Sequence, residues 1–192
     1  SSDLQLKDAA ESLAVGYAED LETVVPPVIR EPSEKLQQAL TTLEPGEEWL
    51  LKPQQVNGQP NLWTPGIKLG VQPGSFFHKT ECFGPVLGLM RADNLDHAID
   101  LANAVDYGLT SGLHSLDDRE IEHWRDRIHA GNAYVNRVTT GAVVRRQPFG
   151  GWKRSAFGYA KAGGPNYVYS LGTWTDTGAN NEALLEKARQ SY

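Results

Sequence analysis

The chain has 192 residues, enough to bury the core of one domain of ordinary size. Hydrophobic residues make up 40% and charged residues 22%, which excludes a chain that is disordered throughout. The net charge of −6 argues against nucleic acid as a partner, and no apolar run reaches the ~20 residues that a membrane span needs. The first residues lack a basic segment followed by an apolar stretch, so we see no secretory signal and expect a cytoplasmic protein.

The first third of the chain predicts two helices and two short strands. Apolar residues near one face indicate a helix over residues 3–14. Ser33 is a suitable N-cap for a second helix, whose leucines recur at a helical interval. Residues 49–51 are typical of a short strand, and one more is expected around Trp63.

The middle of the chain alternates between apolar runs and helical patterns. Strands are expected over residues 85–90, 109–115 and 133–136, with one helix capped by Asn94 and another opened by Asp117 or Asp118. Connections of this length imply parallel strands joined by helical crossovers. This part of the sequence therefore predicts an α/β layer.

The C-terminal part is less regular. Residues 137–164 are rich in glycine and predict a long irregular loop, a kind of segment that is usually functional or disordered. Residues 167–174 alternate like a strand. The polar residues after Asp176 are expected to form a peripheral tail over 177–192.

A loop before the first buried strand carries an acid and an aromatic ring. Glu81 could accept hydrogen bonds from sugar hydroxyl groups, and the ring of Phe83 could pack on a flat heterocycle at the edge of an α/β sheet. Taken alone, the same residues also fit a solvated loop acid beside a core phenylalanine.

Three motifs together resemble the aldehyde dehydrogenase superfamily. Residues 81–86 (ECFGPV), 131–136 (GNAYVN) and 147–155 (QPFGGWKRS) match its E-x-F-G-P-V, G-N-x-Y-[VI]-N and P-F-G-G-x-K-x-S elements, in the same order. The resemblance covers roughly residues 3–175. It implies the parallel-sheet portion of the catalytic domain, with helices on both faces, and it implies that Glu81 and Phe83 bind NAD, with NADP not excluded.

Residues 139–144 (TTGAVV) and 161–165 (KAGGP) resemble the glutamate-semialdehyde (pyrroline-5-carboxylate) dehydrogenases, including the dehydrogenase module of bifunctional proline utilization A proteins. The resemblance implies that backbone N–H groups of Gly141 and Ala142 bind the substrate's α-carboxylate, as adjacent amides can. It also implies that Phe149 packs near the aliphatic chain. Gly141 as a simple turn glycine remains an alternative. Arg145 and Arg146 depart from the family pattern, and could either reinforce carboxylate recognition or point into solvent.

The family's nucleophilic cysteine, general-base glutamate and dinucleotide-binding βαβ half match nothing in this sequence. Cys82, the single cysteine, occupies a variable motif position, so we expect a partly buried, non-catalytic thiol. The resemblance thus implies that residues 1–176 are the C-terminal part of a catalytic region. We expect this polypeptide to be inactive alone and to need the missing N-terminal half as a partner.

Two classes of function remain open at this point. The first is part of an enzyme that oxidises L-glutamate γ-semialdehyde to L-glutamate; the second is a non-catalytic module that serves assembly. The intact Glu81, Phe83, Gly141, Ala142 and Phe149 favour the enzyme, whose two loops should face one crevice. The five dispersed histidines indicate no metal site. The resemblance also implies a homo-oligomer, through sheet edges exchanged by the strand expected at 167–174.

Overall fold

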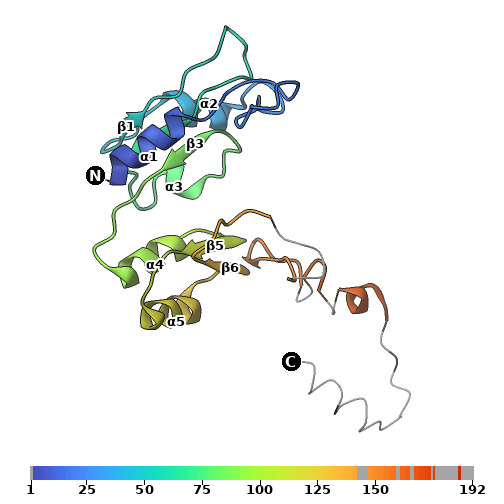
Figure 1. Ribbon diagram of the computed structural model, residues 1–192. Helices are drawn as coiled ribbons and strands as arrows, with labels where there is room; N and C mark the ends of the chain where they lie inside the picture. The colour runs from blue at the N-terminus through green and yellow to red at the C-terminus, as the bar shows by residue number, and fades with distance from the viewer. Residues whose placement is uncertain are drawn as a thin grey trace.

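The computed structural model describes residues 2–141, 147–158, 161–164, 167–173, 175 and 186. Its elements lie in two connected parts, one above the other in Figure 1. The upper part contains α1 (Ser2–Glu11), α2 (Glu34–Thr41), β1 (Glu48–Leu51), β2 (Gly66–Leu69), α3 (Phe76–Lys79) and β3 (Val86–Gly88). The lower part contains α4 (Leu95–Asn103), β4 (Tyr107–Gly108), β5 (Thr110–Leu113), α5 (Asp118–Arg127), β6 (Asn132–Val135) and β7 (Trp152–Lys153).

Strand pairing confirms parallel strands but divides them among separate sheets. β1 pairs antiparallel with β2, and β2 pairs parallel with β3 through Gly66–Val86 and Lys68–Gly88. β5 and β6, joined by α5, pair parallel from Thr110–Asn132 to Leu113–Val135, as expected of a strand–helix–strand unit. The strands expected at 85–90 and 109–115 belong to different sheets, because β3 pairs with β2 and β5 pairs with β6.

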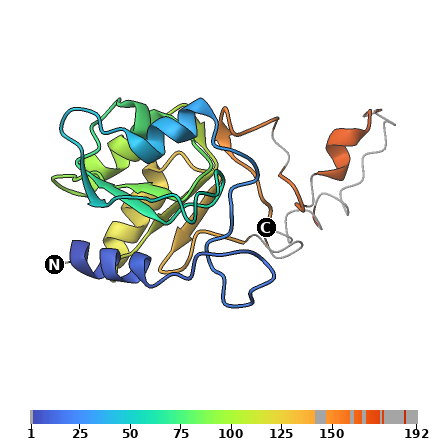
Figure 2. The ribbon, with the colours of Figure 1, turned by 90° about the horizontal axis from the view of Figure 1, so that it is seen from above.

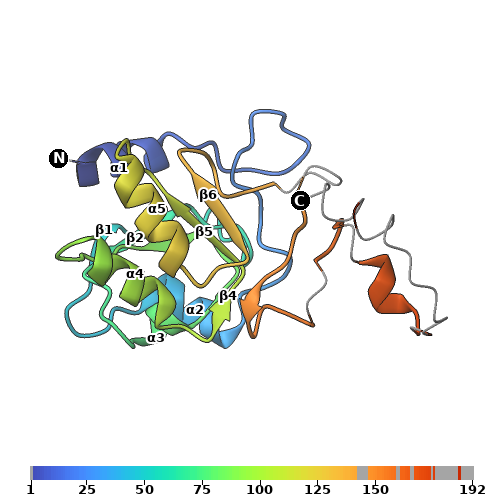
Figure 3. The same ribbon diagram turned by 90° about the horizontal axis from the view of Figure 1, so that it is seen from below.

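Side-chain caps fix the starts of the two helices below β5 and β6. The Asn94 side chain accepts a hydrogen bond from His97 N, and the Asp117 side chain accepts one from Arg119 N. Each cap satisfies an amide that the helix itself leaves free. Both predicted helix starts are therefore confirmed. Figure 3 shows α4 and α5 side by side, next to β5 and β6.

Each of the two parts has a small hydrophobic core of its own. In the upper part, Leu36 and Leu40 of α2 are buried against Trp63. In the lower part, Ile99 of α4 packs with Trp124 and Ile128 at the end of α5. Each such buried side chain contributes roughly 1.5–3 kcal/mol. The face of α5 that carries Trp124 is therefore a core face.

The expected strand at residues 167–174 was wrong. Val168–Leu171 form a single 3-10 turn, seen as the separate coil in Figure 2. Local bonds replace a strand ladder there, since Ser170 N and Ser170 Oγ both bind Tyr167 O, at 3.2 and 2.6 Å. The expected homo-oligomer, and the exchange of sheet edges through this segment, stay predictions. No helix in the described part of the chain is both long and apolar enough to cross a membrane.

Candidate functional site

The loop with Glu81 and Phe83 connects α3 to β3. Ser75 caps α3 by accepting a hydrogen bond from His78 N, and the helix ends at Lys79. Phe83 has a φ of +53°, uncommon for a bulky residue, and its side chain is 77% exposed. Glu81 is exposed as well. The loop thus presents a carboxylate and an aromatic ring outward.

Helix α2 contacts this loop through two of its residues. Lys35 Nζ donates a 2.7 Å hydrogen bond to the main-chain carbonyl of Glu81 and lies 5.9 Å from the centroid of the Phe83 ring. Gly84 lies so close to Leu36 that an added Cβ would come within 2.2 Å of Leu36 Cδ1. The sequence motif gave no sign of Lys35, because this lysine lies 46 residues before Glu81.

Cys82 points away from the exposed face of the loop. Its side chain packs against the core formed by Leu36, Leu40 and Trp63, and its Sγ lies 3.5 Å from Thr80 O. Burial raises the pKa of the thiol, and the nearby Lys35 and Lys68 ammonium groups only partly offset that effect. The expected partial burial is confirmed, and a raised pKa disfavours the thiolate that a nucleophile needs.

The motifs at residues 131–136 and 147–155 meet across a close contact. Asn132 is 4% exposed; its Nδ2 donates to Leu109 O at 2.9 Å, and its Oδ1 accepts from Gly150 N at 3.3 Å. A Cβ on Gly131 would lie 2.0 Å from Gly150 O. Lys161 Nζ donates to Gly131 O at 2.7 Å. These contacts fix the backbone around Phe149.

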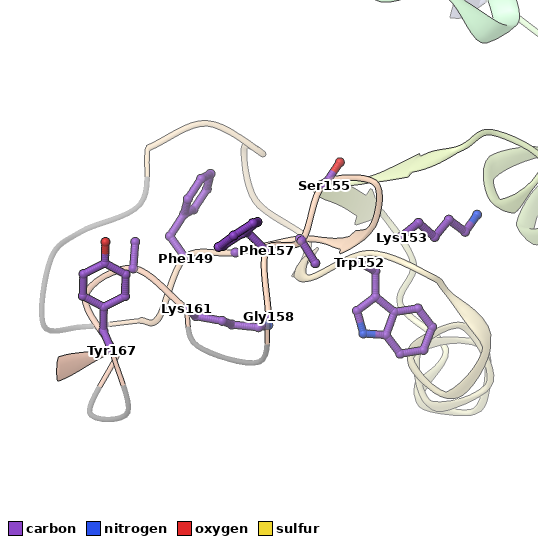
Figure 4. A pocket seen from close by; sticks show the side chains of 12 residues that line it. Phe149, Trp152, Lys153, Ser155, Phe157, Gly158, Lys161 and Tyr167 are labelled. Atoms are coloured by element: carbon purple, nitrogen blue, oxygen red, sulfur yellow. The ribbon is translucent and has the colours of Figure 1, made fainter. Parts of the chain in front are cut away.

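Phe149 lines a cavity in the C-terminal part of the chain. Its backbone pairs with Ala162 through two hydrogen bonds of 2.8 Å. The cavity has a volume of about 650 Å³, and the rings of Phe149, Phe157 and Tyr167 line it together with the Lys161 stem (Figure 4). Phe157 and Tyr167 were not expected here, because a bridge within an irregular loop leaves no periodic pattern to detect.

Gly141 follows β6 and has a φ of +80°. Among the described residues, no heavy atom lies within 4 Å of a Cβ placed on it, so none of them blocks an approach to its backbone. Ala142, Arg145 and Arg146 lie outside the described residues, and their expected roles stay predictions.

The structure does not join the two candidate loops directly. The segment between α3 and β3 lies in the upper part of Figure 1, and the segment after β6 leaves the lower part. No hydrogen bond or ion pair connects Glu81 or Phe83 to Gly141 or Phe149 in the part of the chain that the structure describes. A shared crevice therefore stays a prediction. Within the same described residues, no cluster of three metal-ligating side chains occurs.

Comparison with known proteins defines the class. The sequence model that describes the aldehyde dehydrogenase family matches residues 4–175, so the chain belongs to this family. Among individual relatives, the 1-pyrroline-5-carboxylate dehydrogenase of Bacillus subtilis is 36% identical over 158 residues, which are 82% of this chain and 30% of that protein. The chain therefore spans about a third of the length of this relative.

Solved structures agree with the fold. Proline utilization A from Corynebacterium freiburgense is 54% identical, with a TM-score of 0.88 over 92% of this chain and 18% of that one. A 1-pyrroline-5-carboxylate dehydrogenase from Thermus with bound NAD is 31% identical, with a TM-score of 0.76 over 86% of this chain and 32% of that one. The separate small sheets are thus a portion of the aldehyde dehydrogenase fold.

Proposed function

We propose that this chain is the C-terminal part of an NAD(P)-dependent dehydrogenase that oxidises L-glutamate γ-semialdehyde to L-glutamate. Residues 1–176 would form the catalytic portion and 177–192 a peripheral tail. One observation carries the proposal: the side chains of Glu81 and Phe83 are exposed on one loop. The chain that holds this loop is similar to 1-pyrroline-5-carboxylate dehydrogenases. The similar Thermus enzyme has bound NAD, which supports the choice of cofactor.

The cofactor fits what the first loop offers. The exposed Glu81 carboxylate makes no ion pair among the described residues, so it is available to accept hydrogen bonds from ribose hydroxyl groups. The exposed Phe83 ring supplies a flat apolar surface for a heterocycle. NAD, when bound, supplies the hydride acceptor. This chain's contribution is then to hold and orient the cofactor.

The second loop would hold the substrate. The open backbone at Gly141, followed by Ala142, could offer adjacent N–H groups to the α-carboxylate of the semialdehyde. Phe149 would pack on the aliphatic chain and orient the aldehyde carbon. Orientation of this kind lowers the activation free energy of the reaction, because the reacting atoms are already in position.

The nucleophilic cysteine would come from a segment upstream of these 192 residues, because Cys82 is the single cysteine among them. The family reaction needs a cysteine thiolate, and Cys82 has a raised pKa and packs against a core. We therefore expect the 192-residue polypeptide to be inactive and the full-length enzyme that contains it to be active.

One experiment compares the two polypeptides. Purified 192-residue chain and the full-length protein are each mixed with glutamate semialdehyde and NAD or NADP, and reduced cofactor is followed at its absorbance band. We expect turnover by the full-length protein alone. Turnover by the short chain would refute the assignment of the nucleophile, and an inactive full-length protein would instead favour a non-catalytic assembly module. Light scattering on the same samples would test the expected homo-oligomer.

A further inference from the structure

Helix α2 presents one cation to the candidate cofactor loop. The helix is anchored by the buried Leu36 and Leu40, so the position of its first turn is fixed by the core. Lys35 lies in that turn, and its ammonium group reaches the Glu81 carbonyl at 2.7 Å. The contact joins segments that are 46 residues apart, which no local preference would produce.

The same ammonium group also lies near the ring of Phe83, 5.9 Å from its centroid. A cation at this distance from an aromatic ring is attracted to the negative face of the ring, weakly where the site is exposed. A φ above zero is strained for a phenylalanine and persists only where contacts with the surroundings offset the strain. Lys35 and the close Gly84–Leu36 contact supply such a hold.

The hydrogen-bond acceptor of the Lys35 ammonium group is a main-chain oxygen, which leaves the Glu81 side chain available. Lys35 binds the main-chain oxygen of Glu81 rather than its carboxylate, and the described residues give that carboxylate no ion pair. A lysine paired with the carboxylate would compete with a ligand for it. A lysine bound to the carbonyl instead fixes the backbone and leaves the acid free.

We infer that Lys35 is a positioning residue, which orients Glu81 and Phe83 for cofactor binding without itself carrying out chemistry. The role in binding NAD rests on the proposed function. The hold on the loop does not, so the two parts can be tested separately. Lys35→Met removes the charge and the donor but keeps the apolar stem, Lys35→Arg keeps both, and Lys52→Met is the matched control at an exposed lysine.

Hydrogen–deuterium exchange tests the hold on the loop without any activity measurement. In the 192-residue chain, Lys35→Met should speed exchange in the peptide covering residues 81–84 by about fivefold, the factor expected from losing a weak charged contact. Lys35→Arg and Lys52→Met should leave it within about twofold of the parent. Unchanged exchange in Lys35→Met would overturn the inference.

Steady-state kinetics of the full-length enzyme test the link to the cofactor. Lys35→Met should raise the KM for NAD about fivefold while the KM for the semialdehyde changes less than about twofold, and Lys35→Arg should recover most of the loss. A lower Tm with both KM values raised equally would mean general destabilisation and would overturn the positioning role. An inactive parent enzyme would refute the proposed function, whereas faster loop exchange in Lys35→Met would still support the hold.

Discussion

The side chain of Asn132 joins two motifs, since its Oδ1 accepts a 3.3 Å hydrogen bond from the backbone N of Gly150, 18 residues further along the chain. Its Nδ2 donates to Leu109 O, so this buried amide uses both of its ends. Asn132 therefore ties β6 to the segment that carries Phe149.

Replacement of Asn132 by alanine should destabilise the chain by about 2 kcal/mol, because Gly150 N loses its partner inside a close contact. Urea unfolding followed by tryptophan fluorescence measures the change. Gln59→Ala, at an exposed amide side chain, is the control and should shift stability by less than about 0.5 kcal/mol. Equal effects of the two substitutions would show that the Asn132 bridge contributes nothing.

The fit between Gly131 and Gly150 leads to a second prediction. A methyl group at Gly131 would lie 2.0 Å from Gly150 O and 2.6 Å from Gly151 Cα, both main-chain atoms that cannot move aside cheaply. We expect Gly131→Ala to cost about 3 kcal/mol and to displace the segment with Phe149. Limited proteolysis within residues 147–158 should become faster.

Gly172→Ala is the matched control for that substitution. None of the described residues places a heavy atom within 4 Å of the Cβ position at Gly172, and its φ of −116° is open to any residue. Its stability and proteolysis should match the parent. A Gly131→Ala chain that unfolds and is cleaved like the Gly172→Ala chain would contradict the tight contact.

Local interactions explain which elements could be predicted from sequence. The caps at Asn94 and Asp117 involve bonds that span two or three residues, so the residue type alone reports them. The β5–α5–β6 unit was equally predictable, since each part shows its own apolar pattern. The strand partner of β3 was not, because pairing with β2 depends on contacts between distant segments.

The candidate site shows the same division. The motif positions Glu81, Phe83 and Phe149 could be found from sequence because they stand in short runs of characteristic residues. Lys35 could not, since only the packing of α2 against Gly84 brings it to the loop. The prediction of a strand over Val168–Leu171 was wrong because an alternating pattern forms a strand only if another strand lies beside it. These residues form a 3-10 turn instead.

A buried ion pair in the upper part yields a third prediction. Lys68 Nζ lies 3.2 Å from Glu47 Oε2, with side chains 2% and 0% exposed, and it also donates to Thr42 O at 2.6 Å. Glu47→Ala would leave the ammonium group buried without its counter-charge and should cost about 3–5 kcal/mol. Urea unfolding measures this loss, with the exposed neighbour Glu48→Ala as a near-neutral control.

The double variant Glu47→Leu with Lys68→Met sharpens that test. Glu47 Oε1 is buried and has no hydrogen-bond partner among the described residues, so the pair is incompletely satisfied. Replacing both charges by apolar side chains should therefore recover most of the stability lost in Glu47→Ala. A double variant less stable than Glu47→Ala would show that the pair is strongly stabilising in its own right.

A fourth prediction concerns acid sensitivity at the α4–α5 contact. The hydrogen bond from His123 Nε2 to Asp96 Oδ1, at 2.5 Å, holds the pKa of the Asp96 carboxyl below its ordinary value of 3.8, and the charge of Arg127 acts in the same direction. A carboxyl whose pKa is lower in the folded state stabilises the fold at pH values above its ordinary pKa, and this contribution disappears as the pH falls through the folded pKa.

The Tm of the parent should therefore fall between about pH 5 and about pH 2.5, and the Tm of Asp96→Asn should fall less over the same range. Asp126→Asn, a carboxylate removed from the same helix as His123, is the control and should keep the parent's slope. If Asp96→Asn and Asp126→Asn lose stability in parallel with the parent across this range, the link between α4 and α5 through Asp96 does not stabilise the folded chain.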